Sequence, residues 1–264
     1  MGWMSAGALR LGLLAALPLG AGPAVAVVGG QPDDGLSMRA SVMVLSSNGG
    51  VCSAVVIAPD AVLTAAHCAT GAAAHRVHYK EGSEPVLLPP TAVAVHPGYD
   101  AGAVAARRRS IDLAIVRLGG PLPPRFEAAT LSAAVPAKDA VLTVGGWGVS
   151  AEGEPRTTGT FRTAALRAVE PHGPSRILLW ARGASGAAGA TGAVGAVGAV
   201  GIGACRGDSG GPIAAETGVV AVSTWATGAG AKSCGALTQG VLLGPQRGWI
   251  DGVLAGWGRS ARWN

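Results

Sequence analysis

The stretch Cys205-Arg206-Gly207-Asp208-Ser209-Gly210-Gly211-Pro212 decides how the rest of this sequence is interpreted. Three glycines within five positions leave the backbone too unconstrained for a helix or the interior of a strand. A tight turn is the better interpretation, because it exposes the Ser209 hydroxyl and directs neighbouring N–H groups at a point where negative charge can develop. Ser209 is therefore the candidate nucleophile, and the rest of the chain must supply a base.

The candidate base is His67. It follows an apolar stretch and precedes Cys68, which can fix its backbone. A buried structural role is the alternative for a lone histidine in this setting. The other four histidines lie in polar, proline-adjacent or glycine-adjacent surroundings, and we expect surface or structural positions for His75, His78, His96 and His172.

A third group must orient the imidazole and stabilise its charged form, which calls for a mostly buried carboxylate. Asp112 opens the apolar run 112–118, where a charge without a partner would be costly. Asp100 and Asp139 lie in turn-like surroundings and are weaker candidates. We expect Asp112 to act with the candidate base and nucleophile.

Four cysteines lie near these candidates and permit three disulfide pairings. Pairing Cys52 with Cys68 and Cys205 with Cys234 would hold the neighbourhoods of the candidate base and the candidate nucleophile. A zinc site is the competing interpretation, but no two cysteines have the short C-x-x-C spacing. We therefore expect disulfides and no metal.

Residues 1–26 have the layout of a secretory signal peptide. Arg10 ends a short charged segment, residues 11–21 are apolar, and Ala24-Val25-Ala26 fits the small-x-small cleavage rule. The apolar run is short for a membrane span. Cleavage would make Val27 the first residue and would place the protein outside the cell, where disulfides persist. We expect a secreted protein with no membrane attachment after cleavage.

The net charge of +5 is a mild excess in a chain with only 13% charged residues. Residues 107–109 form its one basic cluster, and no aromatic residues alternate with these arginines to stack on bases. A nucleic-acid partner is therefore not expected.

Short apolar stretches separated by Gly, Pro, Asn or Asp run through the rest of the chain and predict a mainly β architecture, a barrel or a sandwich. The clearest helical candidate is 245–254, where apolar residues recur at helical spacing. We expect strands over 41–45, 51–57, 61–66, 76–79, 86–88, 92–95, 113–118, 141–144, 177–180 and 219–223.

Residues 183–203 break this pattern, because a glycine occupies every third position from Gly183 to Gly201. A collagen triple helix is the formal match, but the run is short and contains no proline. We interpret the segment as a Gly/Ala-rich insertion in a β domain.

Five motifs, in this order, resemble the chymotrypsin-like (trypsin-like) serine proteases: Val27-Val28-Gly29-Gly30, Thr64-Ala65-Ala66-His67-Cys68, Asp112-Leu113-Ala114-Ile115, Gly145-Gly146-Trp147-Gly148 and Gly207-Asp208-Ser209-Gly210-Gly211-Pro212. The resemblance extends from Val27 to Trp249-Ile250, which is nearly all of the chain after the predicted signal peptide. It implies an all-β fold of two six-stranded antiparallel β-barrels with a C-terminal helix, divided at roughly 120–135, with the active site between the barrels.

The resemblance also implies a role for each residue of the 205–212 stretch and its partners. His67 and Asp112 would come from the first barrel and Ser209 from the second. The N–H groups of Gly207 and Ser209 would form an oxyanion hole. Asp208 would pair with the α-ammonium of a mature chain that begins at Val27, so that signal cleavage itself would create the activating terminus.

The substrate pocket follows from the same resemblance. Gly203 would lie at its base, Thr224-Trp225-Ala226 would form its edge strand, and Gly240 would lie on the opposite wall. An acid at the base would be needed to pair with a substrate Arg or Lys. With glycine at position 203, we expect a preference for small or medium apolar side chains at P1, the residue before the cleaved bond.

Taken together, the sequence predicts a secreted serine endopeptidase that works through an acyl-enzyme intermediate, with no cofactor. The expected partners are protein or peptide substrates and protein protease inhibitors, and the expected state is a monomer. The alternative is a catalytically silent binding homologue of the same fold. A matrix or adhesion role for the glycine repeat or for Arg206-Gly207-Asp208 has less support, because the resemblance commits Asp208 to an internal partner.

Overall fold

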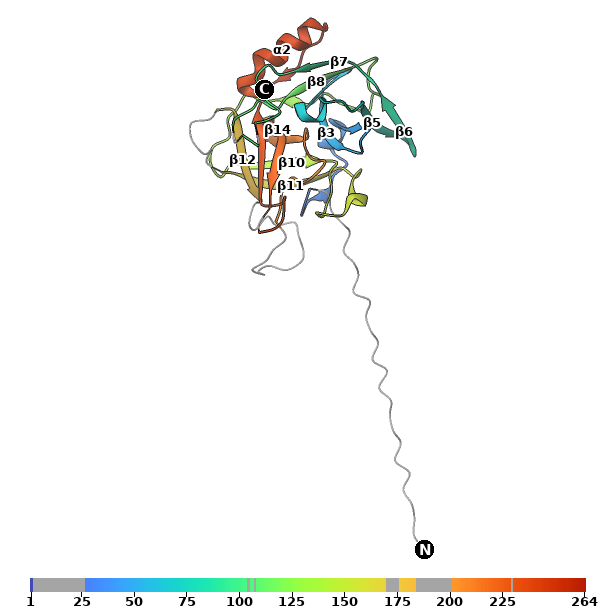
Figure 1. Cartoon of the computed structure of the whole chain (residues 1–264), viewed down its shortest axis with the longest axis vertical. Helices are drawn as coiled ribbons and strands as arrows, with labels where there is room; N and C mark the ends of the chain where they lie inside the picture. The colour runs from blue at the N-terminus through green and yellow to red at the C-terminus, as the bar shows by residue number, and fades with distance from the viewer. Residues whose placement is uncertain (2–26, 104, 107, 170–175, 184–200, 229) are drawn as a thin grey trace.

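The structure is a computed structural model that describes residues 1, 27–103, 105–106, 108–169, 176–183, 201–228 and 230–264 (Figure 1). The expected signal peptide, apart from Met1, and most of the expected Gly/Ala-rich insertion lie outside these ranges. None of the helices in the described segments is long and apolar enough to cross a lipid bilayer.

The first half of the chain forms a seven-stranded antiparallel sheet that curls into a half-barrel. Its order is β6-β5-β2-β3-β4-β8-β7, so the two edge strands β6 and β7 are consecutive along the chain, separated by Pro89. Proline has no N–H to donate, which favours a break in the strand at this point. The strands are β2 (Ser41–Ser46), β3 (Val51–Ala58), β4 (Ala61–Thr64), β5 (His75–Glu81), β6 (Glu84–Leu88), β7 (Pro90–Val95) and β8 (Ala114–Leu118).

The second half forms a closed six-stranded barrel. Its order is β13-β10-β11-β12-β15-β14, and β14 pairs again with β13 to close the ring. Closure leaves none of these six strands with an unpaired edge along its whole length. The strands are β10 (Val141–Gly146), β11 (Arg162–Val169), β12 (Leu178–Gly183), β13 (Pro212–Ala215), β14 (Gly218–Thr227) and β15 (Leu237–Leu242).

Short elements complete the fold. Among the strands, β1 (Gln31–Pro32) pairs with β11, and β9 (Thr130–Leu131) lies parallel to both β14 and β16 (Arg262–Trp263). The helices are α1 (Leu36–Arg39), α2 (Arg247–Gly256) and the single turns η1 (Ala66–Cys68), η2 (Pro155–Thr157) and η3 (Gly244–Gln246).

A shared core holds the halves together. Ile250 and Leu254 of α2 are fully buried in a cluster that also contains Ile115 of β8 and Val222 of β14. Arg259, after α2, donates two hydrogen bonds to the buried carboxylate of Asp60 in the first half, at 2.7 and 3.0 Å. The C-terminal segment therefore contacts both sheets and fixes the cleft between them.

The predicted all-β fold with a C-terminal helix is confirmed. Two expectations differ in detail, because the first sheet is a curled half-barrel and because the barrel strands β11, β13 and β15 have no counterpart among the expected strands. β11 alternates buried and less buried residues, but apart from Leu166 and Val169 it consists of alanine, threonine and arginine. β15 opens with Leu-Thr-Gln-Gly, so neither strand has the apolar run on which the expectation relied.

Candidate active site

A cleft of about 710 Å³ lies between the two halves of the molecule. His67, Tyr99 and Asp112 line it from the first half, and Ser209 and Trp225 line it from the second. The residues that the sequence singled out as base, orienting acid and nucleophile therefore share one cavity.

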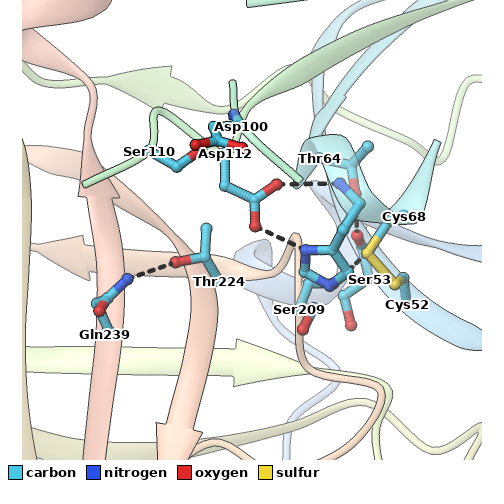
Figure 2. Close-up of polar contacts among 11 residues, drawn as sticks. Cys52, Ser53, Thr64, Cys68, Asp100, Ser110, Asp112, Ser209, Thr224 and Gln239 are labelled. Carbon is cyan, nitrogen blue, oxygen red and sulfur yellow. Dashed lines mark hydrogen bonds and ion pairs between the residues drawn. A yellow bond between two sulfur atoms is a disulfide. The ribbon is translucent and has the colours of Figure 1, made fainter. Parts of the chain in front are cut away.

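Strand pairing brings His67 and Asp112 together. Thr64 at the end of β4 pairs with Ala114 at the start of β8, and the two strands are antiparallel. The segment that follows Thr64 and the segment that precedes Ala114 therefore lie side by side, and they contain His67 and Asp112. Asp112 accepts two hydrogen bonds, from the His67 backbone N at 3.0 Å and from the His67 ring Nδ1 at 2.7 Å (Figure 2). An ionised carboxylate can only accept, so the imidazole proton lies on Nδ1 and Nε2 is free to take a proton.

Ser53 connects the first sheet to the Ser209 loop, and the sequence did not indicate it. Its backbone N donates to the Ser209 carbonyl at 2.8 Å, and its hydroxyl donates to the Gly207 carbonyl at 2.8 Å. The same hydroxyl accepts from the Trp147 N at 2.9 Å, and Thr64 Oγ1 donates to the Ser53 carbonyl at 2.7 Å. The available signal was a serine beside Cys52 in an otherwise apolar stretch, and the structure shows this serine to be fully buried.

The backbone of the Ser209 loop requires glycine at position 207. Gly207 has a φ of +94°, and a Cβ there would lie 2.6 Å from the Gly148 Cα. Within the described part of the chain, no recorded hydrogen bond uses the N–H of Gly207 or the N–H of Ser209. Two backbone donors are therefore left for a ligand next to the Ser209 hydroxyl.

Asp208 is fully buried and accepts hydrogen bonds from two backbone N–H groups, Gly148 at 2.9 Å and Cys205 at 2.9 Å. Burial raises the pKa of its carboxyl to about 7, although these two hydrogen bonds and the charge of Arg162 favour the ionised form. The Asp208 carboxylate also leaves no room for a side chain at Gly146, because a Cβ there would lie 2.2 Å from Asp208 Oδ1. A further cation beside this carboxyl would favour its ionised form at neutral pH.

Val27 and Val28 are buried beside this loop. Val28 packs in one apolar cluster with Val149 and Cys205, and its carbonyl accepts from the Gly203 N at 3.1 Å. Val27 is 0% exposed and has a φ of +47°, a left-handed conformation that is unfavourable for a β-branched residue. The torsion angle φ involves the preceding carbonyl carbon, so this strain would not exist in a chain that begins at Val27.

The expected pocket residues divide into two groups. Thr224, Trp225 and Ala226 line the cleft, whereas Gly203 and Gly240 are not among the described residues that line it. Gly240 lies inside the barrel, where a Cβ would be 2.7 Å from Ile213 Cδ1.

Thr238 fills the space next to Gly203, and the sequence did not indicate it either. A Cβ on Gly203 would lie 2.9 Å from Thr238 Oγ1, which accepts a hydrogen bond from the Ala204 N at 3.0 Å. Thr238 pairs with Ala226 across β14 and β15, so it lies directly beside a residue that lines the cleft. Thr224 is the extra residue of a β-bulge in this pairing.

The four cysteines form the disulfides Cys52–Cys68 and Cys205–Cys234. The first lies beside His67 and the second begins the Ser209 loop. The ligand atoms of Cys52, His67 and Cys68 lie within 4.8 Å of one another, but the two sulfurs are bonded to each other and do not fit a metal ion.

Comparison with known proteins agrees with this geometry. The family model for trypsin matches residues 27–241. Trypsin zeta of Drosophila melanogaster is 28% identical over 220 residues, which cover 78% of this chain and 74% of that protein. A trypsin-like protease of Streptomyces glaucescens is 30% identical over 220 residues, which cover 79% and 75% of the two chains.

A solved structure shows the same fold. Neuropsin, a serine protease expressed in the limbic system of mouse brain, aligns with a TM-score of 0.66 at 18% identity and covers 86% of this chain and 99% of its own. At this identity the likeness concerns the fold alone, and the assignment rests on the family model, which spans most of the sequence. This chain belongs to the trypsin family of serine proteases.

Proposed function

We propose that the protein is a secreted serine endopeptidase in which Ser209, His67 and Asp112 form the catalytic triad. The observation that carries the proposal is the His67 Nδ1 to Asp112 Oδ2 hydrogen bond of 2.7 Å in the same cleft as Ser209. Asp112 keeps only 17% of its side chain exposed, whereas His67 keeps 40%. The acid is thus sheltered behind the base, and the base faces the substrate.

The chemistry follows from these positions. Ser209 Oγ attacks the carbonyl carbon of the peptide bond while His67 Nε2 takes its proton, and the Asp112 carboxylate stabilises the imidazolium that forms. His67 then protonates the leaving amine, which departs and leaves an acyl-enzyme on Ser209. Water, activated by the same nitrogen, hydrolyses the ester and restores the serine.

The negative charge that develops on the carbonyl oxygen is stabilised by the backbone of the Ser209 loop. The N–H groups of Gly207 and Ser209 are the proposed oxyanion hole. Two hydrogen bonds support this role: the Arg206 carbonyl, in the same peptide plane as the Gly207 N–H, accepts from the Val149 N at 2.8 Å, and the Asp208 carbonyl, in the same plane as the Ser209 N–H, accepts from the Gly211 N at 3.0 Å. With the carbonyls of Arg206 and Asp208 held, the peptide planes that carry the two N–H groups are fixed before substrate arrives, which limits reorganisation during the reaction.

The pocket supports a preference for small or medium apolar P1 side chains. Among the described residues, those of the second half that line the cleft include no acid, and Gly203, which is not one of them, supplies no charge either. Ala226 adds a methyl group on the strand paired with Thr238. A substrate lysine or arginine would lose its hydration without gaining an acidic partner at the base.

Maturation at the bond between Ala26 and Val27 is supported by two features of the described chain. Cleavage would remove the unfavourable φ of Val27 and would create an ammonium group where Val27 and Val28 are buried beside the Asp208 loop. An adjacent cation would lower the pKa of Asp208, which burial raises to about 7. The proposed Val27–Asp208 ion pair would therefore keep Asp208 charged at neutral pH.

Secretion, peptide substrates, protein inhibitors and a monomeric state complete the proposal. Two disulfides suit an extracellular protein, since cytosolic thiols are normally kept reduced. Residues from both halves line the cleft, so an extended peptide bound there would contact both halves.

Fluorophosphonate labelling tests the triad directly. The secreted protein is expected to react at Ser209, and Ser209→Ala is expected to abolish labelling. Asp112→Asn should lower kcat for a peptide substrate by about 10⁴-fold, because the imidazole would then hold the wrong tautomer. A folded protein that is not labelled would favour the catalytically silent homologue.

Cleavage of a peptide library tests the pocket. Peptides with a small or medium apolar P1 residue are expected to have a kcat/KM at least about tenfold higher than peptides with Arg or Lys at P1. Tenfold is the discrimination that roughly one favourable methylene contact supplies. Thr238→Ala should extend the preference towards larger side chains, whereas Thr91→Ala, an exposed site on β7, should leave it unchanged. A wild-type preference for Arg or Lys would contradict the assigned pocket.

Amino-terminal sequencing of the secreted protein tests maturation. The first residue is expected to be Val27, because the cleavage rule and the buried position of Val27 agree. A secreted, active form that begins upstream of Val27 would rule out activation by signal cleavage.

A further inference from the structure

Glu152 and Ser233 make a direct contact between two loops of the second barrel. The Ser233 backbone N donates to both carboxylate oxygens of Glu152, at 2.9 and 3.0 Å, and the Ser233 hydroxyl donates to Oε1 as well. The two residues are 81 positions apart in the sequence. We call this contact the latch.

One end of the latch belongs to a loop that already holds the Ser209 loop. The Gly148 N donates to the Asp208 carboxylate at 2.9 Å, and the Val149 N donates to the Arg206 carbonyl at 2.8 Å. Glu152 follows three residues later. The loop is also tied internally, because Thr157 Oγ1 accepts from the Ser150 N at 2.9 Å.

The other end of the latch belongs to the wall of the cleft. Ser233 lines the cleft and precedes Cys234, which is bonded to Cys205. Cys205 in turn donates its N–H to Asp208. Val149, Cys205 and Cys234 also pack in one buried cluster. The latch therefore adds a polar contact between two loops that the disulfide and these apolar contacts already connect.

The charges near the latch favour its closed state. The hydrogen bonds from Ser233 hold the pKa of Glu152 below its usual value, and the positive charges of Arg206 and Lys232 act in the same direction. Arg206 also lines the cleft. A glutamine at position 152 would have a similar shape, but only one acceptor oxygen and no negative charge.

We propose that Glu152 is a positioning residue for the substrate pocket. By accepting from Ser233, it holds the wall at 233–234 in place against the Ser209 loop, so that a peptide meets a preformed pocket. The structural part of this proposal stands on the contacts alone, and its kinetic consequence rests on the proposed peptidase function. Loss of the latch should weaken substrate binding more than it slows the chemistry, because none of its atoms belongs to the proposed triad.

The test compares Glu152→Gln with the wild type and with Glu154→Gln, a control that removes an exposed carboxylate two residues away. Hydrogen exchange at the Ser233 amide is expected to become faster by about threefold to tenfold in Glu152→Gln, as a charge-assisted hydrogen bond is replaced by a weaker one. KM for a peptide substrate should rise by a similar factor, with kcat within about twofold of the wild type.

Variants of the partner and a pH series separate positioning from general destabilisation. Ser233→Thr keeps both donors and should behave as wild type, and Ser233→Ala keeps only the N–H and should be intermediate. The folded state lowers the pKa of Glu152, so the latch should persist above the usual glutamate range and weaken as the pH falls through the lowered pKa. The exchange difference between wild type and Glu152→Gln should therefore shrink in acid.

The outcomes distinguish the two proposals. Unchanged Ser233 exchange in Glu152→Gln, or an equal effect in Glu154→Gln, overturns the latch even if the enzyme is active. A wild type that does not hydrolyse peptides contradicts the proposed function, while faster exchange in Glu152→Gln alone still supports the latch.

Discussion

The buried carboxylate of Asp208 is the constraint on which the catalytic end of the second barrel depends. It is removed from water, so its two oxygens must be satisfied from within, and the backbone of Gly148 and Cys205 approaches closely enough to donate. That approach leaves no room for side chains at Gly146 and Gly148. The glycines at 146 and 148 are therefore explained by the Asp208 carboxylate, which occupies the space that their side chains would need.

The first sheet contributes more than the base and the orienting acid. Ser53 reaches across from β3 and holds the carbonyls of Gly207 and Ser209, while the β4–β8 pairing places His67 beside Asp112. The cleft thus depends on contacts between the halves, and the shared core around α2 fixes their separation. A proposed serine nucleophile on one sheet and its base on the other can keep a constant geometry only if this interface is rigid.

Residues that the sequence singled out by their immediate neighbours lie together in the cleft, whereas residues that reach it only through tertiary contacts were not predicted. The sequence indicated His67 because it lies beside Cys68, and it indicated Asp112 because an apolar run follows it. It did not indicate Thr238, because the place of Thr238 beside Gly203 arises only from the β14–β15 register and the bulge at Thr224. β11 and β15 were missed for a related reason, since a closed barrel buries even alanine-rich and glycine-containing strands.

The proposed partner of Asp208 is the α-ammonium of Val27, and the pKa of Asp208 reports on it directly. Burial without that cation raises the pKa to about 7, which costs stability as the pH rises from the usual aspartate range through 7. Carbon-13 NMR of the labelled Asp208 carboxyl can follow this titration in the full chain and in a chain that begins at Val27. We expect a pKa near 7 in the full chain and a value well below it in the shorter one, and equal values in both would contradict the ion pair.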